Sequence, residues 1–141
     1  MITLNSIATT AISTATGTAS QEFAGLVNEK LCRKVCVNQS IQPSASVTYS
    51  IDSVTTIDTT TFVRIKVSGI LTYVPKGCNG CQTLTQSFTE YTTIIFSNSA
   101  ATAAPTVSLN QGTSRGYLAN VYCLAASNYE VATDVTVTAT Y

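Results

Sequence analysis

Val131-Ala-Thr-Asp-Val-Thr-Val-Thr-Ala-Thr-Tyr141 closes the chain with a regular alternation of two kinds of residue. The odd-numbered positions are apolar except for Thr133, and the even-numbered positions carry mainly Thr. Successive side chains of a β-strand point to opposite faces, so a period of two predicts a strand with one buried and one hydroxyl-covered face. The same pattern recurs through most of the chain.

Two long segments repeat this alternation on either side of a turn. Phe62–Val74 places one apolar set on a single face, and Gly69 interrupts it, so we expect a bulge or bend there. Thr83–Phe96 predicts a second strand, and the Gly- and Asn-rich stretch Pro75–Cys81 joins the two as a hairpin. Shorter strands are expected at Val47–Ile51, Thr106–Leu109 and Tyr117–Ala125.

Residues 20–36 have a different spacing. Their apolar residues recur at helical intervals and predict a short helix: Phe23, Leu26, Val27, Leu31 and Val35. We therefore expect a mainly β fold, namely a single β-sandwich of six to eight antiparallel strands, Ig-like or jelly-roll in style. The sandwich domain would span residues 20–141 and include the helix.

Residues 1–19 form a predicted N-terminal arm of low complexity. Its apolar residues Ile2, Leu4, Ile7 and Ile12 lie among Thr, Ala and Ser. Two interpretations stay open, namely a mobile arm or a strand that adds to the sheet edge of a neighbouring subunit. Met1–Thr10 lacks the basic region and the unbroken apolar region of a secretory signal, so we expect none.

Composition narrows the possible functions. The chain has 141 residues, seven basic and seven acidic, no His, and many hydroxyl side chains (25 Thr and 15 Ser). Zero net charge argues against nucleic-acid binding and favours association with protein. No apolar run reaches the roughly 18 residues of a membrane span. Without His, and with scattered carboxylates, we expect no enzyme and no cofactor.

Five cysteines are the sharpest local feature, and three interpretations remain open. Cys32 and Cys36 form one close pair, Cys78 and Cys81 form another, and Cys123 stands apart. The two pairs supply the four thiolates of a tetrahedral zinc site. Alternatively some of the five form disulfides or cross-links, with an odd thiol left over, or they are free and buried like small apolar residues.

The sequence Tyr73-Val-Pro-Lys-Gly-Cys-Asn-Gly-Cys-Gln82, followed by Thr83–Phe96, carries a family resemblance. Over about residues 45–141 the chain resembles small virion proteins of crAss-like tailed phages, in which a similar cysteine hairpin precedes a Phe-Thr-Glu strand. The resemblance implies a capsid auxiliary or decoration role without catalytic residues. The composition is also similar to that of subunits of extracellular filaments such as bacterial spore appendages, whose cysteines lie at the very N-terminus.

These observations predict a non-enzymatic structural protein of a multi-subunit assembly. Its partners would be copies of itself or capsid subunits, bound through the arm and the β-surface, and its location would be the virion. A self-assembling extracellular filament subunit, cross-linked by disulfides, is the alternative. A soluble sugar- or protein-binding module is the third hypothesis, although the chain has no Trp on which a sugar would stack.

Overall fold

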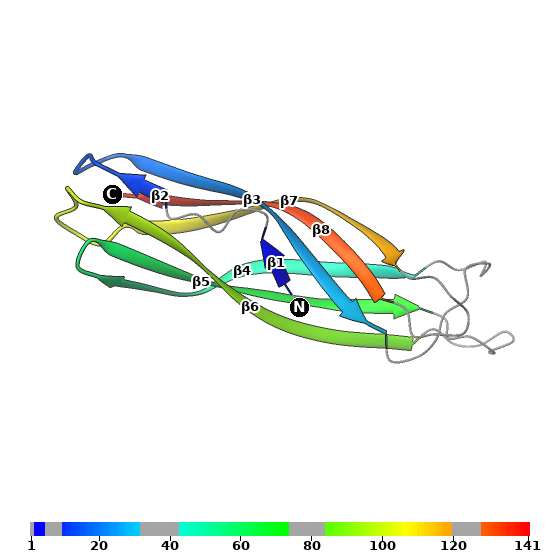
Figure 1. The fold of residues 1–141 in the computed structure, drawn as a ribbon. Helices are drawn as coiled ribbons and strands as arrows, with labels where there is room; N and C mark the ends of the chain where they lie inside the picture. The colour runs from blue at the N-terminus through cyan, green and yellow to red at the C-terminus, as the bar shows by residue number, and fades with distance from the viewer. Residues whose placement is uncertain (1, 5–9, 32–42, 74–83, 120–127) are drawn as a thin grey trace, which may run out of the picture.

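The computed structural model describes residues 2–4, 10–31, 43–73, 84–119 and 128–141. Within these ranges eight strands form two four-stranded sheets (Figure 1). The first sheet has the order β1 (Ile2–Leu4), β3 (Thr18–Lys30), β8 (Asn128–Thr140) and β7 (Thr106–Ala119). The second has the order β2 (Thr10–Ile12), β6 (Leu84–Asn98), β5 (Thr60–Tyr73) and β4 (Ser44–Ile57).

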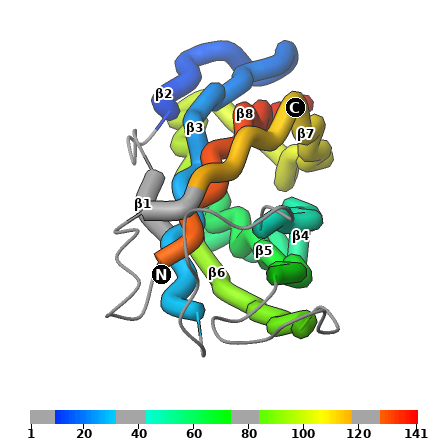
Figure 2. The backbone as a smooth tube through the Cα atoms, turned by 90° about the vertical axis from the view of Figure 1, so that its right-hand side faces the viewer, coloured from blue at the N-terminus to red at the C-terminus, as the bar shows by residue number. Residues whose placement is uncertain are grey.

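The two sheets lie face to face (Figure 2), and their buried side chains form one hydrophobic core. The centre of the core is formed by β-branched residues of β5 and β8, such as Ile65 and Val137, neither of which is exposed to solvent. Aromatic residues, including Phe96 and Tyr73, fill the space beside them. The predicted mainly β class is therefore confirmed.

The alternation in the sequence matches the buried faces. In β8 the odd-numbered residues from Tyr129 to Ala139 are buried. In β5 the predicted inner face is likewise buried: Val63, Ile65, Val67, Leu71 and Tyr73. The predicted hairpin is confirmed, because β5 and β6 pair antiparallel without a break from Thr60 with Ser97 to Tyr73 with Leu84.

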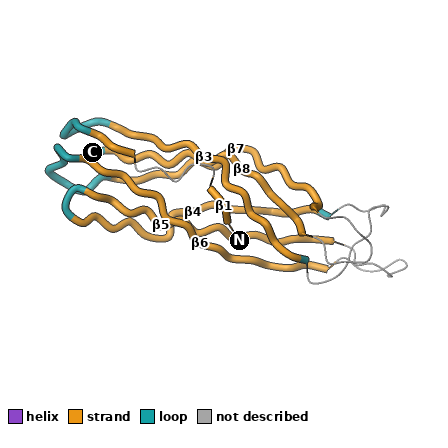
Figure 3. Tube along the Cα trace, in the orientation of Figure 1, coloured by secondary structure: helices purple, strands orange, loops and turns teal. Residues whose placement is uncertain are grey.

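The helix predicted at residues 20–36 is wrong over its described part. Residues 20–30 belong to strand β3, which pairs antiparallel with β8 along its whole length, and no described residue is helical (Figure 3). Phe23, Val27 and Leu31 are spaced by four, which fits one helical turn and equally fits every second residue on one face of a strand. Residues 32–36 lie outside the described part of the chain.

Two details of the predicted strands are also corrected. Gly69 makes no bulge, since β5 keeps its register there with both neighbours, and the ring of Phe88 lies over the glycine. A Cβ at Gly69 would be 2.5 Å from Phe88 Cζ, so the missing side chain makes room for that ring. The strand predicted at Thr106–Leu109 and the described part of the one predicted at Tyr117–Ala125 are joined in β7, which has a register shift between Gln111 and Ser114. Residues 120–125 lie outside the described part of the chain.

Candidate functional site

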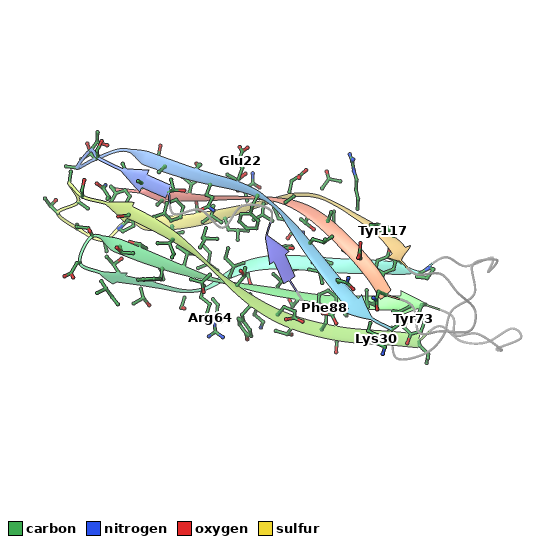
Figure 4. All side chains as sticks on the ribbon, viewed as in Figure 1. Glu22, Lys30, Arg64, Tyr73, Phe88 and Tyr117 are labelled. Carbon is green, nitrogen blue, oxygen red and sulfur yellow. The ribbon has the colours of Figure 1, made fainter. Side chains whose placement is uncertain are left out.

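The part of the chain that the structure describes holds no group of side chains that could bind a metal ion. No three carboxylates or other metal-ligating side chains gather among these residues. Glu22 and Asp134 line one open hollow on the outer face of the first sheet, and Figure 4 shows Glu22 pointing away from the core. The residues considered for zinc or disulfides lie outside the described ranges: Cys32, Cys36, Cys78, Cys81 and Cys123.

The strands that flank these cysteines share one end of the molecule (Figure 1). In the first sheet Lys30 and Ala119 both pair with Asn128, so β3 and β7 end where β8 begins. In the second sheet Tyr73 pairs with Leu84, so β5 ends where β6 begins. At this same end, the described strands lead into each connection whose sequence contains cysteines, and the strands that follow these connections begin.

The N-terminal segment pairs with edges of both sheets within its own chain. In β1, Ile2 and Leu4 align antiparallel with Val27 and Gly25 of β3, at the edge of the first sheet. In β2, Thr10–Ile12 runs parallel to Phe96–Asn98 of β6, at the edge of the second sheet. Of the four predicted arm residues, Ile12 is half-buried and Ile7 lies outside the described ranges. Strand β3 begins at Thr18, within the predicted arm.

Polar side chains hold β2 and the residues after it in place. The amide of Asn98, which is fully buried, donates from Nδ2 to the Thr14 carbonyl oxygen at 2.8 Å. Thr10 Oγ1 donates to Gln21 Oε1 at 3.3 Å, and the Ser99 amide donates to the Ile12 carbonyl oxygen at 3.3 Å. The attachment is thus mainly polar, because none of the described residues from 10 to 17 is buried.

On the opposite side of the molecule, the described side chain of Gln111 bridges the edges of the two sheets. Strands β4 and β7 are the edges there, and Figure 2 shows them together on one side. Gln111 of β7 accepts from the Tyr49 amide through Oε1 at 2.9 Å and donates from Nε2 to the Val47 carbonyl oxygen at 2.8 Å. Its primary amide thereby forms the two hydrogen bonds that a peptide group of an additional strand would form with this edge of β4.

The outer face of the second sheet is covered with hydroxyl groups. Ser and Thr residues recur along β4, β5 and β6 and line a hollow of about 330 Å³ around Gly69: Ser46, Thr48, Ser68, Ser87 and Thr89. Charge on this face is local. Arg64 lies 4.0 Å from the centre of the Tyr91 ring and 3.4 Å from Asp52, which sits at the bulge of β4. Most of the face is therefore uncharged contact area.

The outer face of the first sheet carries a hydrogen-bonded row across three strands. Asn28 of β3 donates from Nδ2 to Glu130 Oε1 of β8 at 2.9 Å, and the Tyr117 hydroxyl of β7 donates to the other oxygen of that carboxylate. Elsewhere on this face hydroxyls pair directly, as Ser20 does with Thr138 at 2.8 Å. Both outer faces thus combine hydroxyl rows with a few satisfied charges.

A carboxyl pair links the two sheets on the side where β1 and β2 lie. Glu29 of β3 and Glu90 of β6 share a side-chain hydrogen bond. Burial between the sheets, together with the bond to Glu90, raises the pKa of Glu29 above its usual 4.5. The folded protein therefore favours the protonated form of Glu29 more than the unfolded chain does.

We expect Glu29→Gln to raise the melting temperature at about pH 7 and to leave it nearly unchanged at about pH 3. A carboxyl with a raised folded pKa stabilises fully below the unfolded value of 4.5 and loses that contribution as pH rises through the folded pKa. Thermal unfolding at both pH values measures the effect. Glu22→Gln, on the exposed face of the same strand, is the matched control; equal shifts for both variants would contradict the prediction.

No protein-family model, curated protein or solved structure matches the chain. Among the described residues no helix is long and apolar enough to cross a membrane. The fold and the contacts of individual residues are therefore the basis for any functional assignment.

Two residues that organise the sheet edges, Asn98 and Gln111, were missed by the sequence analysis. Asn98 follows the apolar run Ile94–Phe96, where a buried amide is unusual, and this contrast is a signal that sequence reasoning can use. Gln111 precedes a glycine in a polar stretch and carries no such signal, because its partners lie on a strand of the other sheet.

Proposed function

We propose that this chain is a non-enzymatic structural subunit of a multi-subunit protein assembly, built as a β-sandwich of Ig-like or jelly-roll style. The observation that carries the proposal is the N-terminal segment, which adds a strand to an edge of each sheet. Sheet edges are the surfaces through which β-proteins most readily join, and a segment able to complete an edge is suited to link subunits.

The outer faces support the same function. They are largely hydroxyl-bearing, and the chain carries no net charge, so two copies or a copy and another neutral surface approach without electrostatic repulsion. Among assemblies, the resemblance to small virion proteins favours a capsid auxiliary or decoration role in a phage particle. Copies of this chain or capsid subunits are the proposed partners, and the virion is the proposed location.

An extracellular filament subunit is the second candidate, and the end of the molecule described above favours it. The strands flanking all five cysteines end there, so cross-links between subunits would gather at one pole. Thiol titration of native assemblies separates the two candidates. Blocked thiols with reductant-sensitive filaments support the filament, whereas free thiols in particles that also contain a major capsid protein support the virion role.

Sedimentation over a concentration series tests the proposal as a whole. We expect the full chain to form species of one defined size larger than a monomer. Deletion of residues 1–12, which spares β3, should reduce the fraction of that defined species at least about tenfold, since both edge strands are lost, and any irregular aggregation through the uncovered edges would sediment as a broad distribution instead. Leu4→Thr serves as the matched control that keeps both strands. A full-length chain that stays monomeric at millimolar concentration, with no particle or filament in its source, would overturn the proposal.

A further inference from the structure

Strand β2 is attached to its own chain by a short ladder. Thr10–Ile12 makes three register pairs with Phe96–Asn98, and this is the only parallel ladder among the described strands. Parallel pairing is slightly weaker per residue than antiparallel pairing, and no side chain from 10 to 17 is buried. Detaching β2 therefore exposes little apolar surface, and such segments open at low free-energy cost.

The side chains that bind β2, by contrast, are buried, and that of Asn98 is held in place by a further hydrogen bond. Asn98 has no exposed surface, and its amide is fixed at the other end, where Oδ1 accepts from the Ala100 amide at 3.0 Å. Gln21 of β3, in the first sheet, is 6% exposed and accepts a hydrogen bond from Thr10 of β2. An empty edge would leave the Asn98 Nδ2 donor without the Thr14 carbonyl oxygen, so an edge occupied by a strand is favoured over an empty one.

The contacts at this site are ones that an identical segment from another copy satisfies equally. Two of them end on backbone carbonyl oxygens, those of Ile12 and Thr14. The link to β3 is short: residues 13–17 bend back and end at Gly17, which has a φ of 127° and is anchored to Tyr141 by two backbone hydrogen bonds. Extended, these five residues reach about 17 Å.

We propose that the N-terminal segment is exchanged between copies, so that Thr10–Ile12 of one chain pairs with Phe96–Asn98 of a second, and the Asn98 amide of the second copy binds Thr14 of the first. Strand β1, which precedes β2 in the chain, moves with it to the β3 edge of the second copy. The partner at this edge is thus a second copy of this chain. Exchange of identical contacts through a short hinge costs little and links subunits without new side-chain chemistry. The inference rests on the proposed assembly function and specifies how two subunits are joined.

A cysteine pair at one register position tests the exchange. Ala11 and Ser97 are partners in the β2–β6 ladder and lie toward its solvent side, so Ala11→Cys with Ser97→Cys places two thiols within disulfide reach. Equal amounts of unlabelled and ¹⁵N-labelled chain are unfolded together, refolded under reducing conditions, assembled and then oxidised. Mass spectrometry of the peptide linked through positions 11 and 97 separates it from links between the native cysteines.

We expect about half of the 11–97 links in the assembled fraction to join a labelled to an unlabelled peptide, as random exchange between copies requires. The matched control is Ser20→Cys with Thr138→Cys, whose hydroxyls meet across β3 and β8 within one chain. Its links should stay within one isotope. Single-isotope 11–97 links in a sample that assembles would overturn the exchange and leave the assembly function standing, whereas a sample that never assembles would overturn both.

A hinge variant without added cysteines provides an independent measurement. Deleting Ala15 and Thr16 shortens the bend, so β2 no longer reaches its own β6 while it still reaches that of a second copy. At a concentration where at most about one twentieth of the unaltered chain is dimeric, we expect the dimeric fraction of the variant to be at least about tenfold higher, because only the exchanged pairing remains. A dimeric fraction equal to that of the unaltered chain would contradict the exchange.

Discussion

Gly25→Ala is expected to lower the free energy of unfolding by about 2–3 kcal/mol, the usual upper range for overpacking a core. Gly25 of β3 faces the ring of Tyr49, which reaches it from β4 in the other sheet. An added Cβ would meet the Tyr49 hydroxyl directly and would lie 2.8 Å from Cζ, closer than carbon atoms pack. The ring is buried and has little room to move aside.

Urea unfolding of a double-mutant cycle isolates this contact. In a Tyr49→Leu background the added methyl group has space, so Gly25→Ala should cost less than about 1 kcal/mol there. Gly112→Ala is the matched control, because its Cβ would meet its first neighbour only at 3.2 Å. An equal cost of Gly25→Ala in both backgrounds would show that the two sheets do not meet at this pair.

Gln111→Ala is expected to lower the free energy of unfolding by about 2 kcal/mol and to increase self-association. Removal of the side-chain amide leaves the Tyr49 N–H and the Val47 carbonyl oxygen at the β4 edge without their partner. The same loss opens β4 to an added strand, which is how unprotected edges aggregate. Urea unfolding measures the first effect, and light scattering at equal folded fraction measures the second.

The neighbouring residue supplies the control for this prediction. Asn110→Ala removes an amide of similar kind from the exposed face of β7, and we expect a change below about 0.5 kcal/mol. Gln111→Glu separates the two hydrogen bonds, since a carboxylate accepts from Tyr49 but repels the Val47 oxygen. If Gln111→Ala and Asn110→Ala behaved alike, the closure of this edge by Gln111 would be contradicted.

The strands could be predicted from the sequence because one period dominates them. In β8 each buried residue is two positions from the next, and β5 follows the same period except at Gly69, so the face follows from the alternation alone. In β3 the buried residues Phe23 and Val27 fit both periods, and the decision falls to pairing with β8, more than a hundred residues away. The local spacing of apolar residues carries no information about that partner strand, so the sequence predicts a helix there.

The contacts at the sheet edges likewise depend on strands that are distant in the sequence. The path of the arm residues Ile2 and Ile12 depends on which strands lie at the edges, and this is a property of the whole topology. The sequence predicts a bulge or bend at Gly69, but a glycine in a strand has two common causes, a register shift or a covering aromatic ring. Only the position of Phe88 on β6 distinguishes them.

The pairing of β3 with β8 also bears on the order in which the strands pair. Thr18 pairs with Thr140, more than a hundred residues along the chain, whereas β4, β5 and β6 pair with their neighbours in sequence. Closing a short loop costs less entropy than closing a long one, so we expect the meander β4–β5–β6 to form before the first sheet. Until β8 has paired with it, β3 has an open edge that strands of other chains can bind.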